Sequence, residues 1–183
     1  MKESKYIPSE KSFYTNTGSE YKIIHISGKY AWIRFVKTGS VKKIWTSNIP
    51  SGKIKDFYEP TRYGVGYLGD YPQPYYWKEA LQLWSNVLKR CYSDNDPKGY
   101  KKFGTTVDAR WLCFERFLCD LPELENFDKW VTKQNYQLDK DFKCPGANVY
   151  SFHTCKFIPE FDNKQAGKKD KVLVNGQWVA STV

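Results

Sequence analysis

Residues 21–46 read YKIIHISGKYAWIRFVKTGSVKKIWT and contain the clearest β pattern of the chain. In the middle segment, residues 30–37, side chains alternate between two sets, with Ala31, Ile33 and Phe35 against Tyr30, Trp32, Arg34 and Val36. A period of two is typical of a strand with one buried face. Turn sequences at 27–29 and 38–40 separate this segment from β-rich runs on either side. The stretch therefore predicts three antiparallel strands, arranged as a meander or as a small SH3-like barrel.

Outward from this stretch, composition divides the chain into four parts. Residues 1–19 are polar and predict a flexible arm, and residues 20–58 form the small basic β-rich domain. Residues 59–74 hold Pro and Gly at a density that breaks regular structure, so they predict a linker. Residues 75–183 predict a helical domain with a C-terminal hairpin, whose turn is Asn175-Gly176. The predicted fold class is α+β.

The helical domain begins with an apolar stripe. Its members are spaced by 4, 3, 4 and 3 residues, which places them on one face of a helix over residues 75–92: Trp77, Leu81, Trp84, Leu88 and Cys91. Two further helices are predicted, over residues 111–121 and from Pro122 onward.

The charge of the chain favours a polyanionic partner. The formal net charge is +9. Residues 1–60 carry 11 Lys or Arg against 5 Asp or Glu, residues 61–132 carry 10 against 10, and residues 133–183 carry 8 against 5. The excess thus lies at the two ends of the sequence. We expect DNA as the partner, most simply double-stranded DNA.

Cysteine usage and hydropathy favour a cytoplasmic protein. The five cysteines are odd in number and form no CxxC pair, which argues against a zinc ribbon and against a disulfide scaffold. The N-terminus is polar, and no apolar run approaches the roughly 20 residues of a membrane span. We therefore expect reduced thiols, no signal peptide and no membrane partner.

Basic residues beside aromatic ones are candidates for nucleic-acid contact. On the predicted strands these are Arg34, Lys42 and Lys43, close to Tyr30 and Trp32. Aromatic rings can stack on bases while ammonium groups contact phosphates. A Gly-containing loop adds two more candidates, Lys101 and Lys102. A solvated sheet face is the alternative interpretation of the same pattern.

Catalytic chemistry has few candidates in this sequence. Only two histidines occur, so a serine or cysteine triad has no local support. His25 lies in a predicted strand and is interpreted as structural. His153 follows Asp139 and Asp141 by about a dozen residues. Two carboxylates and a histidine could hold a divalent metal and activate water against a phosphate.

Several short motifs in the second half occur in a fixed order. They are Trp84 with Arg90-Cys91-Tyr92, then Val107 with Trp111, Phe114 and Phe117, then Leu138-Asp139-Lys140-Asp141, and finally Gly146, Asn148, Tyr150-Ser151, Cys155 and Phe157-Ile158-Pro159. In this order the chain from about Tyr75 to Asn163 resembles the HNH-endonuclease-like proteins of bacteriophages. Asp108 stands where these proteins usually have Cys.

The resemblance implies a ββα-type nucleic-acid site around residues 136–163, in the cytoplasm of an infected bacterium. In an active HNH site, a histidine beside the first Asp is the general base. Lys140 occupies that position here, and a lysine is normally protonated at neutral pH. An active site would use Asp139 and Asp141 for Mg²⁺, Asn148 to orient a ligand and His153 to assist water. Lys140 and Lys143 suit phosphate contact better.

Three functions follow from these observations. The first is a DNA-binding protein with a degenerate HNH-like domain, which lacks the catalytic histidine. The second is an active Mg²⁺-dependent endonuclease. The third is a protein-binding module that inhibits a host enzyme or defence system, because a fold does not fix a function.

Overall fold

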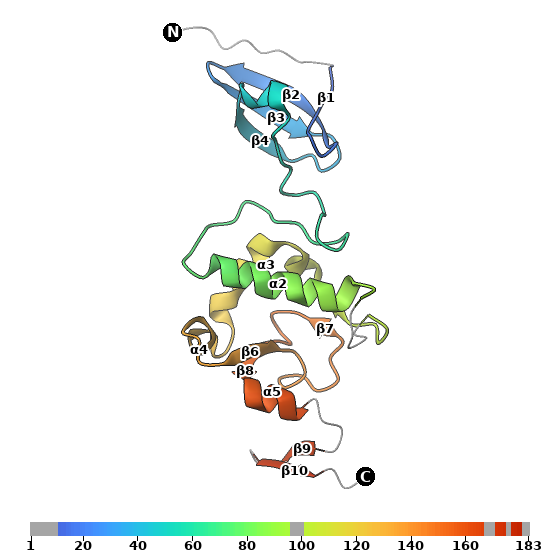
Figure 1. Ribbon diagram of the computed structural model, residues 1–183, viewed down its shortest axis with the longest axis vertical. Helices are drawn as coiled ribbons and strands as arrows, with labels where there is room; N and C mark the ends of the chain where they lie inside the picture. Colours follow the sequence, from blue (N-terminus) through green and yellow to red (C-terminus); the bar gives the residue numbers. More distant parts are fainter. Residues whose placement is uncertain (1–10, 96–100, 167–170, 175–176, 181–183) are drawn as a thin grey trace. The chain divides into compact units, whose positions relative to one another are not determined.

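The structure, a computed structural model, describes residues 11–95, 101–166, 171–174 and 177–180 (Figure 1). The chain divides into two compact units, Met1–Glu59 and Pro60–Val183. The first is built on an antiparallel sheet, and the second combines helices with short strand pairs. The predicted α+β class is therefore confirmed.

The sheet of the first unit is an antiparallel meander, with the strands adjacent in chain order. The strands are β1 (Phe13–Tyr14), β2 (Glu20–Ser27), β3 (Tyr30–Phe35) and β4 (Val41–Trp45), followed by the short helix α1 (Asn48–Ser51). The alternation predicted for β3 is confirmed, because Ala31, Ile33 and Phe35 are buried and Arg34 is exposed. With Tyr21, Ile23, Ile44 and Ile54 they form the core of this unit.

A bulge in β2 changes the face on which its second half presents side chains. Ile23 pairs with Ile33, but the next paired residue is His25, opposite Trp32. An extra residue in one strand shifts the inside–outside alternation by one position. His25 therefore shares a face with Trp32, whereas Ile26 packs against the core.

The predicted flexible arm of residues 1–19 is corrected in its second part. Phe13 and Tyr14 pair with Tyr21 and Glu20 as strand β1, and Thr15 is buried. The ring of Phe13 also stacks on Tyr21, with the centroids 5.7 Å apart. The strand was missed because it is only two residues long and its sequence neighbours are polar. Residues 1–10 lie outside the described part of the chain.

The predicted linker, residues 59–74, contains the boundary between the two units, but from Pro60 onward it is packed as part of the second unit. The Tyr67 N–H donates to the carbonyl of Leu112 at 3.0 Å, and the Phe114 N–H donates back to Tyr67 at 2.9 Å. A Cβ on Gly66 would lie 2.3 Å from Cδ1 of Leu88 and 2.9 Å from Cζ2 of Trp84. The glycine lets this segment lie directly on the helix that carries Trp84.

The helices of the second unit enclose one aromatic core. They are α2 (Trp77–Tyr92), a 3₁₀ turn (Ala109–Leu112), α3 (Phe114–Asp120), a second 3₁₀ turn (Leu121–Glu123) and α4 (Phe127–Val131). The predicted stripe buries Trp84, Leu88 and Cys91, and the Trp84 indole N–H donates to the Trp111 carbonyl at 2.7 Å. The helix predicted over 111–121 is interrupted near Cys113, where the backbone is extended.

A strand–strand–helix unit follows these helices. β6 (Tyr136–Asp139) pairs antiparallel with β8 (Lys156–Pro159), and α5 (Glu160–Ala166) follows β8 directly. The loop between β6 and β8 contains β7 (Val149–Tyr150), which pairs in parallel with β5 (Thr106–Val107). This is the ββα order expected over residues 136–163, and β7 ties its long loop to the helical core.

The predicted C-terminal hairpin is present as two antiparallel strands, β9 (Lys171–Val174) and β10 (Gln177–Ala180). Its turn residues, Asn175 and Gly176, lie outside the described residues. Among the helices in the described part of the chain, none combines the length and apolar character needed to cross a membrane.

Candidate functional site

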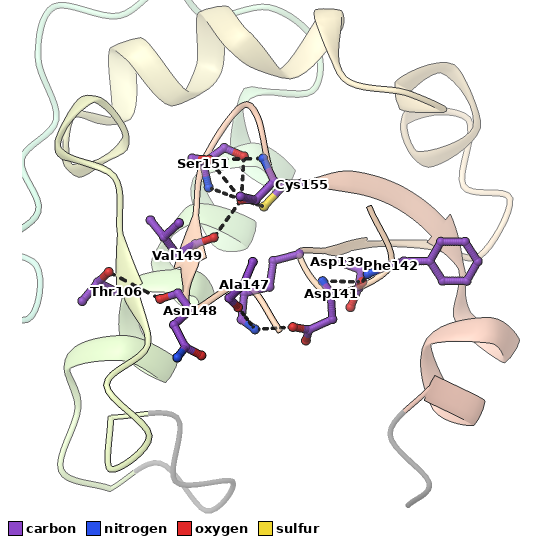
Figure 2. A network of polar contacts seen from close by, with 11 residues as sticks. Thr106, Asp139, Asp141, Phe142, Ala147, Asn148, Val149, Ser151 and Cys155 are labelled. Atoms are coloured by element: carbon purple, nitrogen blue, oxygen red, sulfur yellow. Dashed lines mark hydrogen bonds and ion pairs between the residues drawn. The ribbon is translucent and has the colours of Figure 1, made fainter. Parts of the chain in front are cut away.

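The loop that leaves β6 starts with a carboxylate that caps its own turn. Oδ1 of Asp139 accepts the backbone N–H of Asp141 at 2.9 Å and that of Phe142 at 2.7 Å (Figure 2). Asp139 is buried. Burial raises its pKa above the ordinary value, with a smaller contribution from the Asp141 charge, although the Phe142 N–H opposes the shift. The side chain therefore holds the loop rather than facing solvent.

Lys140, at the position where the resemblance places a general base, is 4% exposed. Its ammonium donates to Oδ1 of Asp141 at 2.5 Å and to the carbonyl of Ala147 at 2.6 Å. It also lies 5.9 Å from the ring centroid of Tyr150. Through the bond to Ala147, the Lys140 side chain connects the beginning and the end of the loop segment 140–147. An ammonium held in this way neither abstracts a proton nor reaches a phosphate.

The residues present fit Mg²⁺ poorly. In the described part of the chain, no three His, Cys, Asp or Glu side chains are grouped so that they could hold a metal ion. The Asp141 carboxylate is paired with the Lys140 ammonium, and Asp139 already accepts two backbone N–H groups. Mg²⁺ prefers several oxygen ligands in octahedral geometry. We therefore assign no step of chemistry to a metal at Asp139 and Asp141.

The other two predicted catalytic residues are exposed and occupied differently. His153 packs its ring edge-on against Phe152, with the centroids 5.5 Å apart, and its carbonyl accepts the Cys144 thiol. The Asn148 carbonyl accepts the Thr106 N–H at 2.8 Å, which is part of the β5–β7 pairing. The Thr106 hydroxyl also donates to this carbonyl, at 3.4 Å (Figure 2). Of the four predicted catalytic residues, Asp139 and Asp141 are in direct contact, because the Asp141 backbone N–H donates to the Asp139 carboxylate.

The far end of the loop is closed by side-chain hydrogen bonds that the sequence analysis missed. The Thr154 hydroxyl donates to the Val149 carbonyl at 2.7 Å, and the Ser151 hydroxyl accepts the Thr154 N–H at 3.2 Å. The spacing Ser151-x-x-Thr154 is a local signal for such a turn. The adjacent Cys155 is fully buried, and burial raises its pKa to about 12, so its thiol is not a nucleophile.

A cavity of about 560 Å³ lies in the second unit, away from this loop. Its walls come from α2, α4, β6 and the start of α5, and they include Tyr76, Glu79, Trp130 and Tyr136. None of the four predicted catalytic residues lines it. The cavity and the predicted catalytic residues therefore do not form one substrate site.

The predicted phosphate-binding lysines of the second unit are partly neutralised by neighbours. Lys101 pairs with Asp94 at 2.5 Å, and its hydrogen bond lowers the pKa of that carboxyl. Lys143 lies 3.8 Å from Glu125. Lys102 is exposed. Lys102 is therefore the member of this set with the most accessible charge.

The outer face of the first unit's sheet gathers a larger set of cations and rings. We define the outer sheet face by the basic and aromatic side chains on the outward side of β2, β3 and β4, together with the turn residue Lys29: Lys22, His25, Lys29, Tyr30, Trp32, Arg34, Lys43 and Trp45. Glu20, Ser27 and Val41 lie on the same side of these strands. Its rings form two cross-strand pairs, Tyr30 with Trp45 at 4.7 Å and His25 with Trp32 at 5.0 Å between centroids.

Ammonium groups lie over these rings. Nζ of Lys43 is 4.1 Å from the Tyr30 centroid and 5.2 Å from that of Trp32, and Nζ of Lys29 is 4.6 Å from that of Trp45. Sequence reasoning found Arg34 and Lys43 but missed Lys22, Lys29 and Trp45 on this face. Charged and aromatic residues at every second position of adjacent strands are the signal that identifies them.

Lys42 is a correction to the predicted set. It pairs opposite Ile33 and therefore lies on the core side of the sheet, where its ammonium donates to the Lys55 carbonyl at 2.9 Å. The same group lies 3.7 Å from the Phe57 ring centroid. Adjacent residues of a strand face opposite sides, so Lys42 and Lys43 do not share a surface.

No protein-family model matches the chain, and searches of curated proteins and of solved structures also find no match.

Proposed function

We propose that the chain is a DNA-binding protein whose HNH-like ββα unit does not cleave DNA. The observation that carries the proposal is the state of Lys140, buried and hydrogen bonded to Asp141 and to the Ala147 carbonyl at the position of the general base. A group fixed as a donor cannot activate water.

The charge distribution supports DNA as the partner. The net charge of +9 is concentrated in the first 60 residues and in the last 51, and the outer sheet face carries four of the cations. Binding through Lys and Arg releases counterions from DNA, so its affinity falls steeply with salt. We expect this behaviour from the full chain.

The competing function, a Mg²⁺-dependent endonuclease, predicts strand breaks that depend on Asp139. The test incubates supercoiled plasmid with the full chain and with Asp139→Asn, in Mg²⁺ and in Mn²⁺, and follows nicked and linear forms on a gel. We expect plasmid retarded by both proteins and intact after deproteinisation. Nicking by the unmodified chain that Asp139→Asn abolishes would contradict the proposal and support the endonuclease.

A further inference from the structure

We propose that the outer sheet face binds unpaired DNA, with bases stacked on Trp32, Tyr30 and Trp45 and phosphates held by Lys29, Lys43 and Arg34. The inference rests on the proposed function and deepens it, because it names the form of DNA and the surface. It is carried by the arrangement of rings and cations on three adjacent strands.

The rings lie in consecutive rows across the sheet. Tyr30 pairs opposite Trp45, and two residues further along β3, Trp32 lies between His25 on β2 and Lys43 on β4. Positions two residues apart in a strand are about 6.7 Å apart. Rings in successive rows therefore offer separate stacking surfaces along one line.

These rings are accessible although they belong to an ordered sheet. Trp45 is 46% exposed, and Tyr30 and Trp32 are half-buried. The other side of the same strands is filled by Ala31, Ile33 and Ile44. The core of the unit is thus complete without the outer rings, which leaves them for a ligand.

Charge complementarity selects an anionic ligand. The outer sheet face holds four cationic side chains, Lys22, Lys29, Arg34 and Lys43, and within strands β1 to β4 the single acidic residue is Glu20. Glu20 is the first residue of β2, on the same side as Lys22, and its carboxylate accepts the Ser12 hydroxyl. A cation beside each ring suits a ligand in which anions and aromatic groups alternate.

A single strand of DNA has this alternation, and a duplex does not expose it. In a duplex the base faces are stacked on one another, so a sheet face would meet phosphates and leave its rings unused. In an unpaired strand every base offers a π-face, and stacking on protein rings is tolerant of sequence. The ammonium groups of Lys29 and Lys43, now over the rings, would move to the phosphates as bases take their place.

The test measures anisotropy of a labelled thymidine strand and of a labelled duplex of equal length, titrated with the full chain. We expect tighter binding to the single strand. Trp32→Ala and Trp45→Ala should each weaken that binding about 5- to 150-fold, and Trp45→Phe should restore most of it. Lys43→Gln should lower the slope of log affinity against log salt by about 0.7.

Matched controls change the same residue types elsewhere. Tyr75→Ala removes a ring that is 81% exposed on the second unit, and Lys53→Gln removes an exposed charge from the segment between α1 and the core residue Ile54. Both should bind the single strand as the unmodified chain does. Thermal unfolding of each variant checks that the sheet is retained.

Photocrosslinking of a bromodeoxyuridine strand to the unmodified chain gives a readout that needs no variant, with crosslinks expected at Trp32 and Trp45. Crosslinks confined to the second unit, equal or tighter binding to duplex, or tighter binding to a uridine RNA strand would each overturn the inference. In the first two of these cases the proposed function survives, because DNA is still bound. Absence of binding to any DNA at low salt would overturn both.

Discussion

The Lys140 ammonium and the Ala147 carbonyl, 2.6 Å apart, close the loop that follows β6. The contact uses a main-chain acceptor seven residues away, and Asp141 supplies the counter-charge at 2.5 Å. At the position where the resemblance to HNH-endonuclease-like proteins leads us to expect a histidine, this chain has a lysine that holds the loop. Three predictions test the contacts that hold the second unit together.

Lys140→Met should lower the free energy of unfolding by about 1.5–3 kcal/mol, since it removes hydrogen bonds from a charged donor to buried or part-buried acceptors. The methionine keeps the apolar stem, so packing changes little. Urea denaturation measures the effect. Lys101→Met, which removes an ion pair on an exposed turn, is the control and should match the unmodified chain within error. Equal stability of both variants would mean that Lys140 does not hold the loop.

Asp139→Asn should flatten the pH dependence of stability. Because burial raises the pKa of Asp139 above its ordinary 3.8, ionisation costs free energy in the folded state. The stability that the protonated carboxyl provides is complete below the ordinary value and is lost as pH rises through the folded value. The stability of the unmodified chain relative to Asp139→Asn should therefore fall as the pH rises above the ordinary pKa of 3.8. If the stability of the unmodified chain relative to Asp139→Asn instead rose with pH, the pKa of Asp139 would be lowered in the folded state.

Gly66→Ala should destabilise the second unit by about 1–3 kcal/mol, because the added Cβ would overlap Leu88 and Trp84. The closest contact is with Cδ1 of Leu88, so Leu88→Ala in the same chain should relieve part of the clash. The double variant should lose less stability than the sum of the two single variants. Strict additivity in urea denaturation would contradict the close approach of the Gly66 segment to α2.

The regular patterns of the sequence were enough to predict the main elements. The alternation in residues 30–37 identified the buried side of β3, and the stripe through Trp84 and Leu88 identified α2. These predictions succeeded because burial on one face imposes the period of the element. The strand at Phe13–Tyr14 was missed because two residues are too short for a period to show.

Features that depend on tertiary contacts could not be predicted from the pattern. The bulge near Ile24 turns His25 outward toward Trp32, against the simple alternation of β2. The Lys140 contact was missed because its acceptor is a backbone carbonyl, which carries no sequence signature. The candidate residues Asp139 and Asp141 do lie together, but the Asp141 carboxylate is paired with the Lys140 ammonium and Asp139 accepts the Asp141 N–H.

A titration of the full chain onto labelled DNA, single-stranded and duplex, at two salt concentrations and with Mg²⁺, reads binding and strand integrity in the same samples. We predict binding that weakens steeply at the higher salt, with every strand intact at the end of the titration. DNA cut in the Mg²⁺ samples would contradict the proposal that the ββα unit does not cleave, and no binding at low salt would contradict DNA as the partner.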